Sequence, residues 1–108
     1  MGLDTYAYHG EEPMAPSLFN HRLIGGMFSG NMNSFRGKCY DPYVFRATGI
    51  SLYTEEIPNS KVRHMAEDLK EAHKGLLYVN YITEEESMDL VKFFDTVSKN
   101  NGYLVNWW

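Results

Sequence analysis

Two long segments that each carry a single apolar stripe constrain the fold more than any other feature of the sequence. Residues 58–74 space their apolar side chains at i, i+3, i+4 and i+7, and the apolar side chains of residues 83–99 gather on one helical face at i, i+1, i+4 and i+7, which predicts two amphipathic helices. The stripes consist of Val62, Met65, Ala66 and Leu69 in the first segment and of Leu90, Val91, Phe94 and Val97 in the second. Thr83 and Glu86 form a capping box at the start of the second helix. Because a one-sided helix must bury its stripe against another layer, the rest of the chain has to supply that layer.

Short segments whose sequences favour β-strands can supply this second layer. The predicted strands cover residues 2–8, 34–40, 50–54, 76–81 and 103–108. Asp41 and Pro42 indicate the start of a short helix over residues 42–48, and Gly49 indicates its end. We therefore expect a single domain, residues 1–108, of the α+β class. Its two layers would be a mixed, mostly antiparallel sheet and the helices 58–74, 83–99 and 42–48.

Charge and cysteine content narrow the functional class. The 108 residues include ten Lys and Arg against fourteen Asp and Glu, so the net charge of −4 argues against non-specific binding to nucleic acid or to a membrane surface. No apolar run approaches the roughly 20 residues of a membrane helix, and the N-terminal residues show no secretory pattern. The single cysteine excludes an intrachain disulfide and suits a reducing compartment. We expect a soluble, cytoplasmic protein.

Several short motifs resemble a small family of uncharacterised bacterial, phage and metagenomic proteins. They are the opening GLDTYA, then GGMFSG followed by SFRGK, then SLYTEEIP, and the terminal WW. The similarity runs nearly from end to end, but no activity is known for the family, so no functional residue carries over. What the resemblance implies is a possible phage context, which favours a protein that binds host components over a metabolic enzyme.

A glycine-rich segment, residues 25–38, has the composition most typical of a ligand-binding loop. On a strand over residues 34–40, four side chains would share one face at a spacing of two residues and could cradle an anion. The ligand-binding candidates are His21, Ser34, Arg36, Lys38, Tyr40 and Glu55. The alternative is a glycine-rich hairpin whose basic face is merely solvated.

Evidence for catalysis is weaker. The four histidines do not show a metal-ligand spacing, so we predict neither a metal site nor a cofactor, and no catalytic residue can be named. The alternative to a binding protein is a small phosphate-directed hydrolase or nuclease. It would use Arg36 and Lys38 for phosphate and an acidic residue (Asp4, Glu55 or Glu56) for a metal or as a base.

The C-terminal strand points to an interaction surface. Its alternation places Trp107 with Tyr103 and Val105 on one face and Trp108 on the other, so one tryptophan can enter the core while the other needs a cover. The interface candidates are Tyr6, Tyr8, Trp107 and Trp108. We expect a homo-oligomer, most simply a dimer, unless the loop of residues 9–22 covers the aromatic side chains. The favoured function is a non-enzymatic binding protein whose partner is a protein, such as a host protein, or a small anionic ligand.

Overall fold

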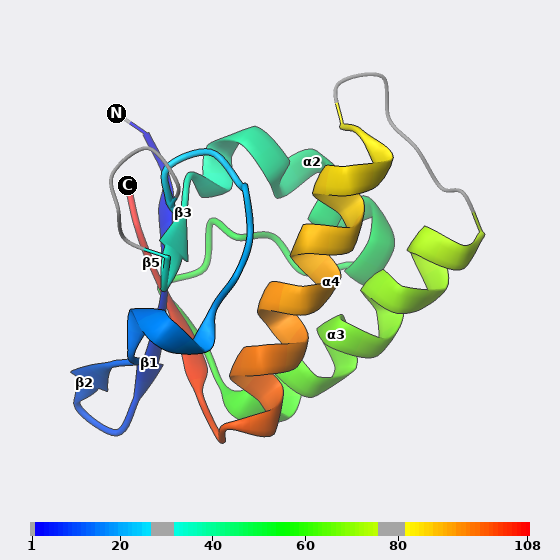
Figure 1. Ribbon diagram of the computed structural model, residues 1–108. Helices are drawn as coiled ribbons and strands as arrows, with labels where there is room; N and C mark the ends of the chain where they lie inside the picture. The colour runs from blue at the N-terminus through cyan, green and yellow to red at the C-terminus, as the bar shows by residue number, and fades with distance from the viewer. Residues whose placement is uncertain (1, 27–31, 76–81) are drawn as a thin grey trace.

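A computed structural model describes residues 2–26, 32–75 and 82–108, and this part of the chain has the expected α+β fold (Figure 1). Within these residues, five antiparallel strands form one open sheet in the order β2-β1-β5-β4, with β3 also paired to β1. The strands are β1 (Asp4–His9), β2 (Glu12–Pro13), β3 (Ser34–Phe35), β4 (Glu56–Ile57) and β5 (Tyr103–Trp107). The helices are η1 (Pro16–Leu18, a 3-10 turn), α2 (Gly37–Thr48), α3 (Asn59–Lys74) and α4 (Glu84–Lys99).

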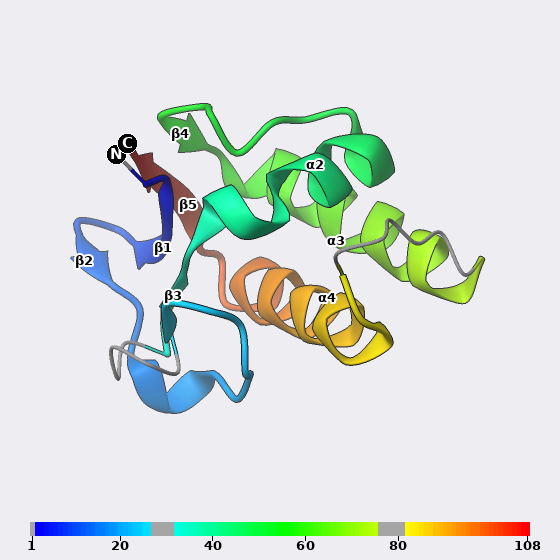
Figure 2. The same ribbon diagram turned by 90° about the horizontal axis from the view of Figure 1, so that it is seen from above.

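The three α-helices lie on one side of the sheet, so the molecule has two layers (Figures 1 and 2). Both predicted helical stripes are buried between the layers, which confirms the amphipathic pattern read from the sequence. Ala7 and Leu104 of the sheet, and Leu3 just before β1, belong to the same core, and each of the three is completely buried. The apolar interior therefore lies entirely on the helix side of β1 and β5.

The start of α4 confirms the predicted capping box. Thr83 is the N-cap, and its hydroxyl oxygen accepts a hydrogen bond from the Glu86 backbone N–H at 3.1 Å. In return, Glu86 Oε1 accepts one from the Thr83 backbone N–H at 3.1 Å. Two N–H groups that the helix itself cannot satisfy are thus paired, which fixes where α4 begins.

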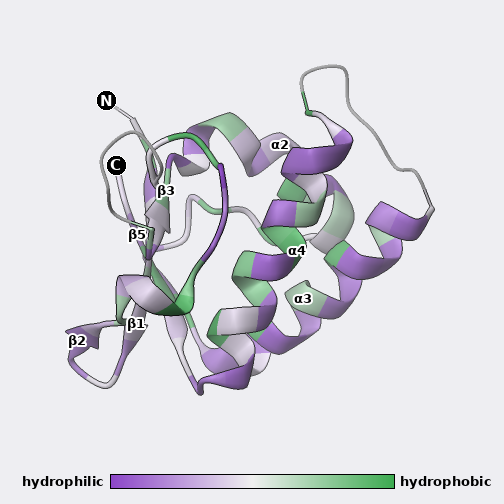
Figure 3. Cartoon of the chain, in the orientation of Figure 1, coloured by the Kyte–Doolittle hydropathy of each residue, from purple (hydrophilic) through white to green (hydrophobic). Residues whose placement is uncertain are grey.

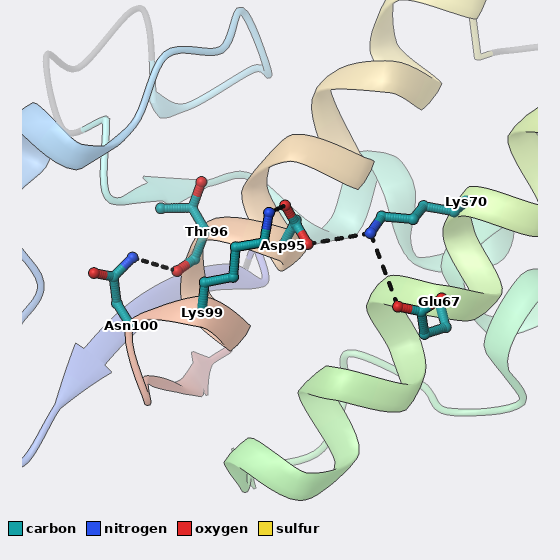
Figure 4. A network of polar contacts seen from close by, with 6 residues as sticks. All are labelled: Glu67, Lys70, Asp95, Thr96, Lys99 and Asn100. Carbon is teal, nitrogen blue, oxygen red and sulfur yellow. Dashed lines mark hydrogen bonds and ion pairs between the residues drawn. The ribbon is translucent and has the colours of Figure 1, made fainter.

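The outer sides of α3 and α4 are polar (Figure 3), and charged side chains connect them. Asp95 on α4 accepts from Lys70 on α3 at 3.3 Å and from Lys99 at 2.9 Å, as Figure 4 shows. Partial burial alone would raise the pKa of Asp95, but the two ammonium groups outweigh it and lower that pKa. Exposed ion pairs of this kind contribute little stability, so the apolar stripes hold the two helices together.

The predicted strand over residues 34–40 is wrong, and so is the start of the short helix at residue 42. Strand β3 ends at Phe35, and α2 already begins at Gly37, with Pro42 inside it. The reason is tertiary: a Cβ on Gly37 would lie 2.5 Å from Thr5 Oγ1, so only glycine lets the chain turn into a helix this close to β1. The predicted end is confirmed, because Gly49 adopts φ 75° as the C-cap.

The predicted strand over residues 50–54 is also absent. Asp41, which we expected to cap a helix, instead accepts hydrogen bonds at Oδ1 from the Leu52 backbone N–H at 2.6 Å and from the Ser51 hydroxyl at 3.1 Å. Thr54 Oγ1 donates to the Ser51 carbonyl at 2.8 Å. These local bonds take groups that a sheet ladder would need, so pairing begins only at β4. The strand predicted over residues 76–81 lies outside the described residues.

Candidate functional site

The side of the sheet that faces away from the helices carries a row of large side chains. The register pairs Tyr8 with Tyr103, Tyr6 with Val105, and Asp4 with Trp107 across β1 and β5. The alternating residues of both strands are buried, whereas these are partly or largely exposed. We call the five residues Tyr6, Tyr8, Tyr103, Val105 and Trp107 the open face. Trp107 keeps 62% of its surface exposed, so the open face presents an uncovered aromatic side chain.

A ring contact and a hydrogen bond hold Tyr8 and Tyr103 of the open face in place. The rings of Tyr8 and Tyr103 lie with their centroids 6.0 Å apart and tilted by 34°. The Tyr103 hydroxyl donates a hydrogen bond to the Gly10 carbonyl at 2.6 Å. A partner that docks here would therefore meet a surface whose side chains are already positioned, which reduces the entropy cost of binding.

A hollow of about 510 Å³ lies where the open face meets β4. We call it the C-terminal hollow; its lining residues are Glu55, Glu56, Val105, Asn106, Trp107 and Trp108. Glu56 is the cross-strand partner of Val105, and the Trp108 ring lies edge-on against Tyr53 with centroids 5.6 Å apart. Of these lining residues two are acidic and none is basic. Two indole rings beside two carboxylates favour a cation.

Asn106, which is buried on the helix side of β5, connects the residues that line the C-terminal hollow. Its Oδ1 accepts from the Thr5 hydroxyl at 2.6 Å, and its Nδ2 donates to the Thr54 carbonyl at 2.8 Å. Its backbone N–H donates to the Glu55 carbonyl at 2.9 Å. These bonds fix the segment before β4 beside the end of β5. We did not predict this role. The signal in the sequence was a polar residue, Asn106, at the inward position that follows Leu104 in the alternation of the strand.

Arg36 lies at the opposite edge of the sheet from Glu56. It directly follows β3 and is the N-cap residue of α2. Its Nε donates to Asp4 Oδ1 at 2.9 Å, and the two side chains remain 46% and 38% exposed. Within residues 2–26, 32–75 and 82–108, Arg36 makes no other side-chain hydrogen bond or ion pair, so the terminal nitrogens of its guanidinium can bind a further acceptor. Arg36 is thus a half-exposed cation with one ion-pair partner, at the border of the open face.

The other members of the predicted anion site do not gather around Arg36. Ser34 is buried in β3, and Lys38 is exposed in the first turn of α2. Tyr40 is buried, and its hydroxyl oxygen accepts from the Ile24 backbone N–H at 2.9 Å. Burial raises the pKa of Tyr40 far above its ordinary value, so it remains a neutral core residue. The alternation that was to align these side chains is lost because α2 replaces the expected strand.

His21 is also a core residue. It is 3% exposed and packs edge-on against Phe93 with ring centroids 5.3 Å apart. One ring nitrogen, Nε2, is 2.7 Å from the Met32 carbonyl, and the other, Nδ1, accepts from the Leu23 backbone N–H at 3.1 Å. Burial lowers the pKa of His21, against smaller opposing effects of the Met32 hydrogen bond and the Asp89 charge. A neutral imidazole with both nitrogens occupied is structural. The remaining candidate, Glu55, lies in the C-terminal hollow.

A serine and a histidine that the sequence analysis did not connect meet between the helices. Ser87 Oγ lies 3.0 Å from His73 Nδ1 and 2.8 Å from the Tyr43 hydroxyl. The distances suit a nucleophile and its base, but Ser87 is completely buried, so no substrate reaches it. The cluster ties α2, α3 and α4 together. Within the described ranges, no three His, Cys, Asp or Glu side chains are placed to hold a metal ion.

The aromatic surface differs in one respect from the prediction. Neither tryptophan enters the core, because Trp108 is 52% exposed as well as Trp107. The alternative cover, the loop of residues 9–22, does not lie over Trp107. Its Phe19 packs against Phe93 of α4 with centroids 4.8 Å apart, and its Met14 is buried. The loop therefore completes the core; it contacts the open face at Tyr103, through the Gly10 carbonyl, and leaves Trp107 exposed.

No family model, curated protein or solved structure matches the chain. The resemblance to a small bacterial, phage and metagenomic family therefore stays a prediction. In the described segments, no helix has both the length and the apolar character that crossing a membrane would need.

Proposed function

We propose that the protein is a non-enzymatic interaction protein that works as a dimer, joined through the open face of its sheet. The observation that carries this proposal is the contrast between the two sides of β1 and β5. Helices bury one side completely, whereas the other side presents tyrosines, a valine and a largely exposed tryptophan. A row of partly exposed aromatic side chains that ends in a largely exposed tryptophan is typical of protein interaction sites.

The geometry favours a protein surface over a small anionic ligand as the occupant. Arg36 already binds Asp4, and the other basic candidate, Lys38, belongs to the first turn of α2. The phosphate-directed hydrolase has the same weakness, because it needs both cations around one phosphate group. The open face, by contrast, is broad and aromatic, and it suits apolar contact over a large area.

A second copy of the chain is the occupant we infer. A standard interface buries about 800 Å² on each partner. The molecule measures 35 × 28 × 25 Å, so one side of it is of the right size to supply that area. A two-fold axis pairs the same surface with itself, and this is the commonest symmetry of soluble oligomers.

Sedimentation equilibrium of the wild type and of two matched variants tests the proposal. Trp107 and Phe45 are both exposed aromatic residues, at 62% and 54%, but Phe45 lies on α2 rather than on the open face. We expect wild type and Phe45→Glu to approach twice the 12.5 kDa chain mass at high micromolar concentration. Trp107→Glu should remain at the single-chain mass, because it removes the largest exposed ring of the open face and adds a third carboxylate beside Glu55 and Glu56.

Two results would contradict the proposal. One is a wild type that stays at 12.5 kDa at every concentration tested. The other is a dimer that Trp107→Glu and the milder Trp107→Ala both leave intact. Circular dichroism spectra of all variants, which should overlay on that of the wild type, separate lost association from lost folding.

A further inference from the structure

Opposite charges lie at the two edges of the open side of the sheet. Arg36 lies at the β3 edge, its ion-pair partner Asp4 is on β1, and Trp107 faces Asp4 from β5. Glu56 lies on β4 at the opposite edge, across from Val105. One edge of the open face therefore carries a cation and the other an anion, with aromatic surface between them.

This order selects one direction for the two-fold axis of the proposed dimer. An axis that runs across the strands would place each edge over the same edge of the other copy, so that Glu56 would face Glu56. An axis that runs along the strands, between β1 and β5, places the β3 edge of one copy over the β4 edge of the other. Arg36 of one copy then meets Glu56 of the other twice, once on each side of the axis, and Glu56 no longer faces Glu56.

We propose that in this dimer Arg36 of each copy enters the C-terminal hollow of the other, where it binds Glu56 and stacks on an indole ring. The inference rests on the proposed dimer and names the contact that fixes its orientation. The hollow has carboxylates and two tryptophans, and none of its lining residues in the described part of the chain is basic. The partner's Arg36 supplies the cation that it lacks.

Arginine fits this role better than lysine would. The guanidinium is planar and can lie against an indole ring while its N–H groups bind a carboxylate. Asp4 engages Nε of Arg36, which leaves the terminal nitrogens for the second acceptor. Gly2 adds room for this group at the sheet edge, because a Cβ there would lie 2.8 Å from Arg36 Nη1. The side chain is thus oriented within its own chain before the copies meet.

A charge exchange between two chains tests the contact. Arg36→Glu and Glu56→Arg each place like charges at both contacts of their own dimer, so each variant alone should dimerise at least about 100-fold more weakly than wild type. In an equimolar mixture, the mixed dimer has opposite charges at both contacts. We expect it to form within about tenfold of the wild-type affinity. Lys38→Glu, which makes the same charge change in the first turn of α2, is the control and should dimerise as wild type does.

A milder set of variants keeps the test valid if a reversed charge disturbs folding. Arg36→Gln and Glu56→Gln should each weaken the dimer, and the double variant should be little weaker than either one, because both remove the same contact. Arg36→Lys, which keeps the charge but not the planar group, should bind about tenfold more weakly than wild type.

The results separate this inference from the dimer on which it rests. If Trp107→Glu abolishes the dimer but Arg36→Glu and Glu56→Arg each associate as wild type does, the open face is the interface and the Arg36 contact is wrong. A mixture that remains monomeric while the separate variants are folded also overturns the contact. A wild type that never dimerises overturns the proposed function itself.

Discussion

The two sides of strand β5 differ sharply although they belong to the same five residues. Leu104 and Asn106 point toward the helices and are 0% and 4% exposed, whereas Trp107, on the other side, is 62% exposed. The buried side holds the fold together, and the larger aromatic side chain is left outside. Substitutions on the two sides should therefore have separable effects: those on the helix side should change the stability of the monomer, and those on the open face should change association.

The largest effect should come from the centre of the helix side. Phe94 is completely buried on α4 and contacts Phe93 and Phe35. Phe94→Ala should lower the free energy of unfolding by about 3–5 kcal/mol, because it removes apolar contacts and leaves a cavity. Urea denaturation below the dimerisation concentration measures this. Phe45→Ala, at an exposed position, should change it by no more than about 0.5 kcal/mol; equal losses in the two variants would contradict the assigned core.

The buried hydrogen bonds of Asn106 on the same side should contribute less to the free energy of unfolding than Phe94 does. Asn106→Ala leaves the Thr5 hydroxyl and the Thr54 carbonyl without their partner. We expect a loss of about 1–3 kcal/mol in the free energy of unfolding. The Asn106 side chain also ties Thr54, the residue before Glu55, to β5, so the variant should loosen the C-terminal hollow and weaken the dimer as well. A variant as stable as wild type would show that this network does not join the two sides.

Acid should weaken the helix side through His21. Burial lowers the pKa of this histidine below its ordinary value of 6.5, so the unfolded chain takes up its proton more readily than the folded one. The stabilising contribution is complete above about pH 6.5 and is lost as the pH falls below that value, with a slope of at most about 1.4 kcal/mol per pH unit. Urea unfolding between pH 7 and pH 5 measures the slope. His21→Gln should flatten it, and an unchanged slope would mean that another group is responsible.

The smallest effect on the monomer should come from the open face. Trp107→Ala should change the free energy of unfolding by no more than about 0.5 kcal/mol, because the side chain is mostly in water already. The same variant should dimerise more weakly than wild type. If its main effect were on monomer stability, the two sides of β5 would not have the separate roles inferred above.

Sequence patterns predicted the parts of the molecule that local spacing decides. The helical stripes, the Thr83 capping box and the alternation that places Tyr6 and Tyr8 opposite Leu3 and Ala7 are all present. Each depends on residues a few positions apart, and no distant contact overrides them.

The anion site and the Asp41 cap could not be predicted in the same way. Gly37 begins a helix because of its distance to Thr5, and Asp41 binds the backbone of Leu52, a contact across eleven residues. The local Asp-Pro signal pointed to residue 42 instead. Tyr40, Tyr43 and Val44 are all buried at helical spacing. That apolar pattern was the signal that could have placed the start of α2 earlier.

The chain has two tryptophans, and both line the C-terminal hollow, so quenching of their fluorescence reports directly on the surface proposed as the interface. The measurement compares quenching by acrylamide with the mass from light scattering as the protein concentration is raised. We predict that quenching falls as the mass rises from one chain to two, because the second copy covers the indole rings. A mass that doubles while quenching stays constant would place the interface elsewhere and contradict the role of the open face.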